Sequence, residues 1–498
     1  MENLKDHLGQ SLEDLKHKKT EQKGFYIPRR YIMAVLLFSI CMLMNCQRSC
    51  LSVAIVAMSS TTKFWDGDQW VDQEAEFDWD SEKKGMLLGA FFYGYFFTQI
   101  PTGYLCMKFG GKNVLLFSMA SASVIHVLIP FIVRFSDSLF FASRVLQGLL
   151  LGFVLPGNHF MWGKWAPMKE KASLVSISVS GLSSGMLTAY PISGILSQYG
   201  FAGGWPSVFY VVGAGGFLWC FAWYILAAES PLEHKTISKQ ELALMDQLSQ
   251  YSSEDDVIPW CSILKNKAVF AVIIANFTFD FSYYTLLITM PLFLRDVHNY
   301  AVATTGMLSA LPWFCMTVMI TLCGYVSDKL RRHLNVGLIR KLFFNSGSIL
   351  SGVLLVISGY IVSSSGTVAV MCLSVAFFGF AFSGFMVNAM DVSPKYGSTI
   401  IGISNSLASV TGFIGPGMVG VITKEGTNDE WIVIFYILAT VSITGGILFA
   451  ILGSGEAQPF VEEVGDDCDA EYERIEKGEE DERTSPPNDE VKNDEIEK

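Results

Sequence analysis

Charged residues are scarce in this chain. They make up 16% of its 498 residues, against roughly 25% in soluble domains, whereas hydrophobic residues make up 51%. A composition so poor in charge excludes an ordinary soluble globular protein and indicates a membrane protein. The chain also lacks a basic face for nucleic acid, because its net charge is −12 and acidic residues gather in one early loop and at the C-terminal end.

Several motifs are missing as well. The sequence contains no phosphate-binding glycine loop and no cluster of metal-ligating residues, which argues against an ATP-driven pump and a metal cofactor. Gly181-Leu-Ser-Ser-Gly185 fits the G-x-S-x-G pattern of serine hydrolases, but it lies inside an apolar run instead of following a strand. The ten cysteines, nine of them in or next to apolar runs, form no secreted disulfide pattern. We therefore predict that the protein is not an enzyme.

Long apolar runs dominate what is present. A helix needs about 20 apolar residues to cross the bilayer core. Twelve such runs lie at 31–58, 86–106, 113–134, 138–162, 172–197, 206–228, 269–295, 302–326, 341–363, 367–391, 398–422 and 431–453. The sequence predicts an all-α membrane protein with twelve transmembrane helices in two pseudo-symmetric six-helix bundles.

A polar stretch separates the two sets of six runs. The predicted regions are a basic leader (1–30), an N-terminal bundle (31–228), a central loop (229–268), a C-terminal bundle (269–453) and an acidic disordered tail (454–498). No cleavable signal peptide precedes the first run, which is expected to serve as its own insertion signal. Loops on the side of the termini are rich in Lys and Arg, so the positive-inside rule places the leader, central loop and tail in the cytosol.

The first run contains a single charge, Arg48. A guanidinium at that depth is costly and must face a polar cavity or a partner instead of lipid. Arginine stays protonated, and its fork of donors matches a carboxylate or a phosphate. We predict that Arg48 binds a small anionic substrate. The alternative is a structural ion pair that holds two helices together.

A short loop motif occurs once in each half. Gly103–Lys112 follows the second run and Gly324–Arg332 follows the eighth, each with a glycine turn and several cations. Two six-helix halves with matching loops are typical of transporters that rock around a site at the repeat interface. Asp328, within the second copy, is predicted to be structural.

These loops resemble the signature of the major facilitator superfamily, as does Arg144–Gly152 in the fourth run. Finer motifs resemble the anion:cation symporter family of sialin, the vesicular glutamate transporters and the sodium–phosphate carriers. They are Arg48 followed by Leu51–Met58, then Phe91–Pro101, His159–Pro167, Ser383–Asp391 and Gly402–Asn405. The resemblance implies a carrier that moves organic or inorganic anions by alternating access, often from lysosomes or vesicles.

The chain departs from this family at positions that handle protons and glutamate. Leu151 and Gln147 stand where relatives carry glutamates in the fourth helix, and Phe279 stands where glutamate carriers place an arginine. Neither proton coupling nor glutamate therefore follows from the resemblance.

Asp280, in the seventh run, is an unusual feature of this chain. A carboxylate at that depth is either protonated or paired with a cation, as a coupling site for H⁺ or Na⁺ requires. We interpret Asp280 as that coupling site. A salt bridge with Arg48 and a position facing water at the helix rim are the alternatives.

Further polar residues complete the predicted site. Hydroxyl, amide and aromatic groups of the second, fourth, seventh and tenth runs are expected to contact substrate; they are Tyr93, Gln99, Gln147, Tyr283, Tyr284 and Asn388. His159 is a second coupling candidate, because imidazole titrates near physiological pH, although a structural histidine is an equal alternative. Arg144 and Asp391 are predicted to be structural.

The combined prediction is a secondary active anion transporter driven by an H⁺ or Na⁺ gradient or by membrane potential. A passive anion uniporter or channel and a transport-dead receptor are the alternatives. The expected location is a lysosomal, vesicular or plasma membrane. In the tail, Tyr472 and Ile475 have the spacing of an adaptor-binding signal.

Overall fold

The described part of the chain covers most of the predicted membrane domain. This computed structural model describes residues 28–458 except residues 66, 100, 168–169, 235, 239–240, 243–259, 331–332 and 394–395. Among side chains, those of residues 171–173, 260–261, 324, 328 and 398 also lie outside the description. The leader up to residue 27 and the adaptor signal at Tyr472 and Ile475 lie outside it as well.

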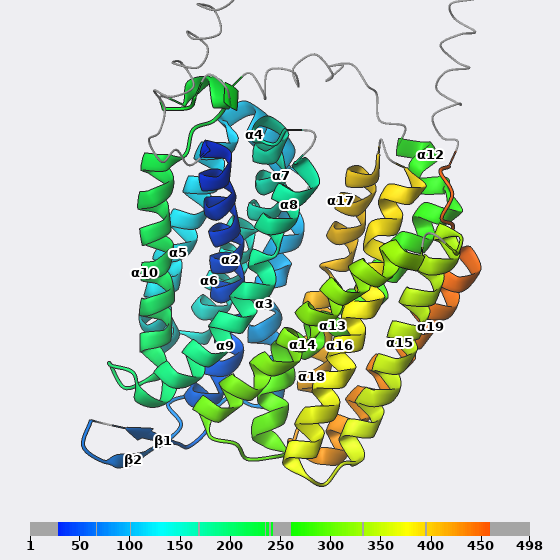
Figure 1. Cartoon of the computed structure of the whole chain (residues 1–498). Coiled ribbons are helices and arrows are strands. Elements are labelled where there is room, and N and C mark those ends of the chain that lie inside the picture. The colour runs from blue at the N-terminus through cyan, green and yellow to red at the C-terminus, as the bar shows by residue number, and fades with distance from the viewer. Residues whose placement is uncertain are drawn as a thin grey trace, which may run out of the picture.

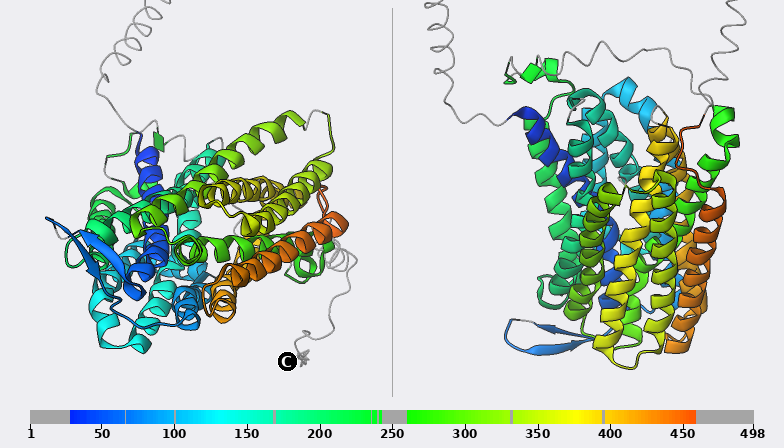
Figure 2. Two further views of the ribbon diagram at one scale, coloured as in Figure 1. Left: turned by 90° about the horizontal axis from the view of Figure 1, so that it is seen from below. Right: turned by 45° about the vertical axis from the view of Figure 1, so that its right-hand side comes forward.

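Two helical bundles stand side by side, and the described ends of the chain lie at one end of both (Figures 1 and 2). The N-terminal bundle contains α2 (Arg29–Ser59), α3 (Ser81–Gln99), α4 (Thr102–Phe109), α5 (Gly111–Phe135), α6 (Asp137–Leu151), α7 (Val154–Trp165), α8 (Lys171–Val179), α9 (Gly181–Tyr199) and α10 (Trp205–Leu226). A 3₁₀ turn, η1 (Pro231–Glu233), follows it. The C-terminal bundle contains α12 (Trp260–Lys265), α13 (Lys267–Asp296), α14 (Val302–Leu330), α15 (Val336–Tyr360), α16 (Ser364–Val392), α17 (Gly397–Ala408), α18 (Thr411–Ile422) and α19 (Asn428–Leu452).

Each of the twelve predicted runs corresponds to a helical pass. In the described residues, ten helices are long and apolar enough to cross a membrane. The predicted runs 86–106 and 172–197 are not among those ten. Each is divided into two helices, α3/α4 and α8/α9, as are the runs 138–162 (α6/α7) and 398–422 (α17/α18), which are among the ten. Pro101 stands at the first of these breaks, where a proline cannot donate a helical hydrogen bond.

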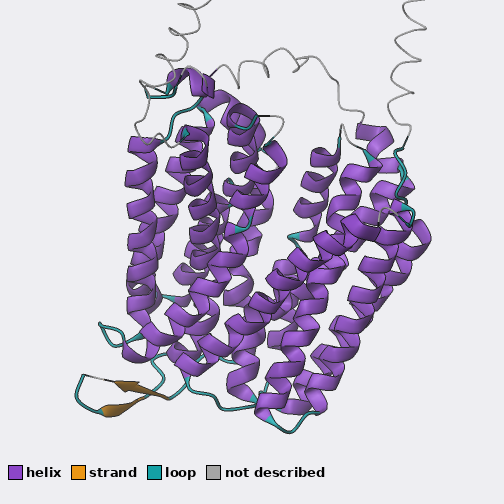
Figure 3. Ribbon diagram, viewed as in Figure 1, coloured by secondary structure: helices purple, strands orange, loops and turns teal. Residues whose placement is uncertain are grey.

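A short hairpin marks one end of the molecule (Figure 3). Strands β1 (Thr62–Trp65) and β2 (Trp70–Gln73) pair antiparallel in the loop between α2 and α3, with Trp65 opposite Trp70. The sequence did not predict this hairpin. We call this end of the bundles the hairpin side, and the opposite end, where Pro28 and Gln458 lie, the terminal side.

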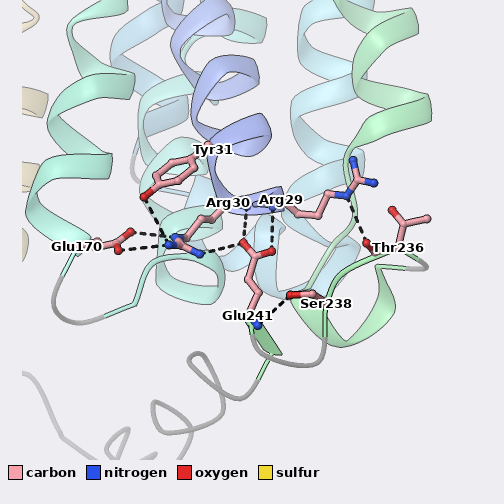
Figure 4. Close-up of polar contacts among 7 residues, drawn as sticks. All are labelled: Arg29, Arg30, Tyr31, Glu170, Thr236, Ser238 and Glu241. Carbon is pink, nitrogen blue, oxygen red and sulfur yellow. Dashed lines mark hydrogen bonds and ion pairs between the residues drawn. The ribbon is translucent and has the colours of Figure 1, made fainter. Parts of the chain in front are cut away.

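On the terminal side, two glutamates hold the start of the central loop against the N-terminal bundle. Glu229 accepts hydrogen bonds from the backbone N–H groups of Gly111 (3.0 Å) and Lys112 (2.8 Å) at the start of α5. Glu241 accepts from the backbone N–H groups of Arg29 (2.9 Å) and Arg30 (3.0 Å) at the start of α2 (Figure 4). Carboxylates at helix N-termini satisfy donors that the helix leaves free.

Arg30 extends this cluster towards the loop before α8. Its guanidinium contacts Glu170 at 2.9 Å and Glu241 at 3.3 Å, as Figure 4 shows. The central loop and two helices therefore share one partly buried charge cluster, which joins them at the terminal end of the N-terminal bundle.

Hydrogen bonds between the two bundles join residues of the middle and the hairpin side. The Tyr190 hydroxyl donates to the Leu287 carbonyl, and the Ala303 N–H donates to Gln198 Oε1 at 3.2 Å. Arg295 donates to the Thr61 carbonyl at 2.8 Å. These contacts close the bundles against each other at the hairpin side.

Helices α3 and α6 approach each other through glycines. A Cβ on Gly148 would overlap the Phe91 carbonyl oxygen, and a Cβ on Gly94 would overlap that of Val145. Two backbones can come this close only where no side chain separates them. The crossing fixes Phe91 and Phe92 of α3 relative to the α6 residues.

Gly148→Ala is expected to destabilise the folded protein, because the added methyl group must push α3 away from α6. The expected loss is about 1–3 kcal/mol of unfolding free energy, as in other overpacked interiors. The measurement is the thermal unfolding midpoint of the purified protein in detergent.

Gly163→Ala is the matched control, since a Cβ on Gly163 meets nothing within 4 Å. Equal midpoints for Gly148→Ala and wild type would show that the α3–α6 crossing tolerates a wider spacing.

Candidate functional site

Arg48 lies near the middle of α2, where the two bundles meet. Its side chain is 7% exposed, and Nε is buried without a hydrogen-bond partner among the described residues. No ion pair in the described part of the chain includes Arg48. The predicted alternative of a structural salt bridge is therefore absent from this conformation.

Aromatic rings from both bundles support this guanidinium. Arg48 Cζ lies 5.5 Å from the ring centroid of Phe92 in α3 and 5.3 Å from that of Tyr284 in α13. The centroids of the two rings are 4.8 Å apart and the ring planes are tilted by 59°, so the Arg48 guanidinium contacts both rings at once. Contact with ring faces stabilises a cation and leaves its N–H edge free for an anion.

Asp280 belongs to the same neighbourhood without pairing to Arg48. The two side chains interact electrostatically across the bundles, but no ion pair or hydrogen bond of Asp280 occurs within the described residues. Asp280 is half-buried and lies one turn before Tyr284. The site thus contains one unpaired cation on α2 and one unpaired carboxylate on α13.

Arg144, in contrast, has partners in two helices. One terminal nitrogen donates to the Gln47 carbonyl at 3.2 Å and to Gln147 Oε1 at 2.6 Å, and the other donates to the Arg48 carbonyl at 3.1 Å. The side chain is 1% exposed. Arg144 therefore connects α6 to the α2 backbone at Gln47 and Arg48, the turn that carries the candidate anion-binding side chain.

Gln147 lies within the N-terminal bundle, where its amide is fully engaged. Besides accepting from Arg144, it donates to Gln47 Oε1 at 3.2 Å and contacts His126 Nδ1 at 2.8 Å. The network continues from Gln47 to Ser123 at 3.0 Å. Substrate contact by Gln147 remains a prediction that this placement does not favour.

Sequence reasoning missed several residues of this region. Gln47 and His126 are fully buried, and both are polar residues inside predicted spans, which is a signal that could have identified them. Trp313 and Phe92 gave no such signal, because aromatic residues are common in membrane helices. Trp313 is 2% exposed, and its Nε1 donor has no partner among the described residues.

The predicted aromatic residues take different positions. Tyr283 and Tyr284 are half-buried and adjoin one another, with ring centroids 5.2 Å apart. Tyr93 instead is 40% exposed and stacks on Phe413 at 4.3 Å. Gln99 lies two turns beyond Phe92 on α3, and its Nε2 is buried without a partner in the described part. Phe92, one residue from the predicted Tyr93, is the α3 ring that meets Arg48.

Other predicted residues lie on the terminal side. His159 is exposed on α7. It follows Arg144 by fifteen residues on the same helical pass, which corresponds to roughly 20 Å along the helix axis at a rise of about 1.5 Å per residue. Asn388 donates to the Ser454 carbonyl at 2.7 Å, and Asp391 pairs with Arg340 at 2.7 Å. The side chain of Asp328 lies outside the described residues. The contacts described for Asn388 and Asp391 do not include Arg48 or the residues beside it, which are Phe92, Asp280 and Tyr284.

Two recesses lie apart from Arg48. One is a shallow recess on the hairpin side, lined by Lys84 of α3, Asp296 of α13 and Thr423 beside α18. The other, also shallow, is lined by Asn276, Phe385 and Ser404 of the C-terminal bundle. Beside it Asn276 donates to Asn405 at 2.7 Å and connects α13 with α17.

Comparisons with known proteins agree with this architecture. Residues 37–416 match the model of the Major Facilitator Superfamily. The chain is 36% identical over 454 residues to vesicular glutamate transporter 1 of Xenopus laevis, covering 88% of this chain and 77% of that protein. It is also 36% identical over 449 residues to vesicular glutamate transporter 2 of Homo sapiens, covering 88% and 76%.

Solved structures share the fold at low sequence identity. The crystal structure of a bacterial homolog of the human lysosomal transporter Spinster, in an inward-facing and unoccupied conformation, matches with a TM-score of 0.67 and 15% identity, covering 87% of this chain and 100% of that one. The D-xylose-proton symporter matches with a TM-score of 0.63 and 13% identity, covering 86% and 99%. Both likenesses concern the fold alone.

Arg144→Lys is expected to destabilise the N-terminal bundle, because one ammonium group cannot reproduce three bonds made from two nitrogens of a rigid fork. Losing hydrogen bonds to a buried charge corresponds to about 2 kcal/mol of unfolding free energy. The measurement is again the thermal unfolding midpoint.

Arg134→Lys provides the comparison, since Arg134 makes a surface ion pair with Glu76 that lysine retains. Its expected effect is below about 1 kcal/mol. If Arg134→Lys lowered the thermal unfolding midpoint as much as Arg144→Lys does, the hydrogen bonds of the buried Arg144 guanidinium would have no special role in stability.

Proposed function

The chain belongs to the major facilitator superfamily, within the anion:cation symporter family of the vesicular glutamate transporters, and we propose that it carries an anion across the membrane by alternating access. The family and the relatives that it matches are transporters. The observation that carries the proposal is the guanidinium of Arg48, buried at mid-depth between two bundles without a counter-ion in the described residues.

Electrostatics supports an anion as the missing partner. A buried cation that lacks both water and a carboxylate is costly, and a substrate carboxylate or phosphate would remove that cost. Phe92 and Tyr284 belong to different bundles, so an anion at Arg48 lies where the bundles must move relative to each other. A site at the repeat interface is what alternating access requires.

Asp280 supplies a candidate for coupling. A carboxylate that lacks a protein partner is available to H⁺ or Na⁺, and its electrostatic interaction with Arg48 links its charge to that of the substrate site. We propose that an H⁺ or Na⁺ gradient, or the membrane potential, drives uptake through this pair.

We propose an orientation and a location that the loops and the relatives support. The positive-inside rule puts the terminal side in the cytosol, so the conformation closed at the hairpin side is closed towards the lumen or the exterior. The matched relatives are vesicular transporters by name, and we propose a vesicular or lysosomal membrane for this chain.

Removing the Arg48 cation is expected to abolish transport without unfolding the protein. Arg48→Ala should lower uptake roughly 30-fold or more, corresponding to about 2 kcal/mol of lost anion binding. The uptake rate of Arg48→Lys should lie between those of Arg48→Ala and the wild type, because lysine keeps the charge but lacks the forked donors of the guanidinium. The assay is uptake into proteoliposomes of a panel containing glutamate, sialate, phosphate, urate and nucleotides.

Arg134→Ala is the control arginine, outside the site. Uptake by Arg48→Ala equal to wild type, with equal protein amount and thermal midpoint, would reject Arg48 as the anion site.

Neutralising Asp280 is expected to uncouple transport. Asp280→Asn should still equilibrate the anion but lose accumulation above the external concentration when a pH or sodium gradient is imposed. Wild-type uptake at two pH values, with and without sodium, sets the reference. A wild type that never accumulates the anion would favour a passive uniporter, and an unchanged gradient dependence in Asp280→Asn would place coupling elsewhere.

A further inference from the structure

The Arg48 site offers positive charge for one anionic group only. Arg144, the other buried arginine at this depth, has partners on α2 and α6. The carboxyl group of Asp280 interacts electrostatically with Arg48 and has no ion pair among the described residues. A second anionic group on the same substrate would therefore face Asp280 or aromatic rings, where a desolvated charge without a counter-ion is costly.

A continuous aromatic wall extends from Arg48 into the C-terminal bundle. Tyr284 adjoins Tyr283, and the Tyr283 ring contacts Trp313 at 5.2 Å and stacks on Phe279 at 5.7 Å. Phe279 in turn lies 5.7 Å from Phe382. Tyr283, Tyr284 and Phe382 keep part of their surface exposed, so the wall presents ring faces and edges to whatever binds there.

One donor on this wall is unused. Trp313 Nε1 is buried and has no hydrogen-bond partner among the described residues, although buried indole N–H groups usually have one. A neutral oxygen on a ligand that occupies the wall would satisfy it. The wall thus combines aromatic rings with the two tyrosine hydroxyls and the unused Trp313 donor, and its described residues include no second cation.

From these observations we infer that the site takes an organic anion with one anionic group and a flat, apolar or aromatic body. The inference rests on the proposed function and specifies its substrate class. The anionic group binds the N–H edge of Arg48, and the body stacks against Tyr284, Tyr283 and Phe382. Offset or edge-to-face ring contacts add to apolar burial, whereas a small dianion gains nothing from the wall.

The test separates charge from ring content with four related acids. Propionate has one carboxylate and no ring, succinate has two and no ring, 3-phenylpropionate has one and a ring, and phenylsuccinate has two and a ring. Each competes for uptake of labelled 3-phenylpropionate by the full chain in proteoliposomes. We expect 3-phenylpropionate to inhibit at a concentration at least tenfold lower than propionate or succinate, and phenylsuccinate to be the weaker of the two ring compounds.

Two variants connect this preference to the wall. Tyr284→Leu should reduce the advantage of 3-phenylpropionate over propionate about tenfold, and Trp313→Phe should keep it because the ring remains. Tyr224→Leu, on a residue 69% exposed on α10, is the matched control. Thermal midpoints recorded with and without 10 mM of each acid show that the variants fold and bind independently of transport.

The outcomes distinguish the two levels of the proposal. If succinate or phenylsuccinate binds best in an Arg48-dependent way, or if all four acids bind equally, the inference about substrate class is wrong and the anion site stands. If none of the four acids stabilises or inhibits the wild type, the inference about substrate class is likewise wrong. If Arg48→Ala binds the acids as well as the wild type does, or if no anion of the uptake panel depends on Arg48, the proposed anion site itself fails.

Discussion

The structure depends on how two arginines are accommodated at the depth where charge is most costly. Arg144 keeps its charge and is stabilised by hydrogen bonds: its two terminal nitrogens reach two backbone carbonyls of α2 and the side-chain amide oxygen of Gln147. Those carbonyls belong to Gln47 and Arg48, so Arg144 holds the turn of α2 from which Arg48 projects. Because like charges repel, the same arrangement favours an Arg48 side chain that points away from Arg144 and towards the other bundle.

That direction explains why the junction between the bundles is aromatic. Phe92 and Tyr284 stabilise the Arg48 cation through their ring faces and bring no negative charge that would compete with an anion. The glycines of the α3–α6 crossing fix Phe92, and the hairpin-side bonds such as Ala303 to Gln198 fix α14 against α9. A rotation of one bundle against the other would separate Phe92 from Tyr284 and alter the surroundings of Arg48 directly.

Much of this could be predicted from the sequence, because the bilayer makes charge and length informative. The twelve runs and Arg48 were visible as long apolar segments and as one charge inside them. Helix ends and breaks were less accessible: α3/α4, α6/α7, α8/α9 and α17/α18 each divide one predicted run, and the β1–β2 hairpin lies in an acidic loop.

Side-chain direction was the hardest feature to predict. Tyr93 and Phe92 are adjacent in sequence, yet successive helix residues differ by about 100° around the axis. Only Phe92 reaches Arg48, while Tyr93 stacks on Phe413 at the exposed surface. The partners of Gln147 likewise come from three helices, and no single run of sequence contains that information.

Under the proposed function, the two unmatched charges of Arg48 and Asp280 also constrain the transport cycle. With Arg48 charged and Asp280 ionised, the empty site carries no net charge, and a bound monoanion makes it −1. Adding one H⁺ or Na⁺ at Asp280 returns the loaded site to neutrality, so a one-to-one complex crosses the bilayer without moving net charge. A dianion loaded with the same single cation would leave one charge to be moved, at about 2.3 kcal/mol per 100 mV. Under the proposed function, and with an H⁺ or Na⁺ gradient as the driving force, one ion at Asp280 makes transport electroneutral for a monoanion and not for a dianion, and a monoanion is the substrate class that the aromatic wall favours by contact.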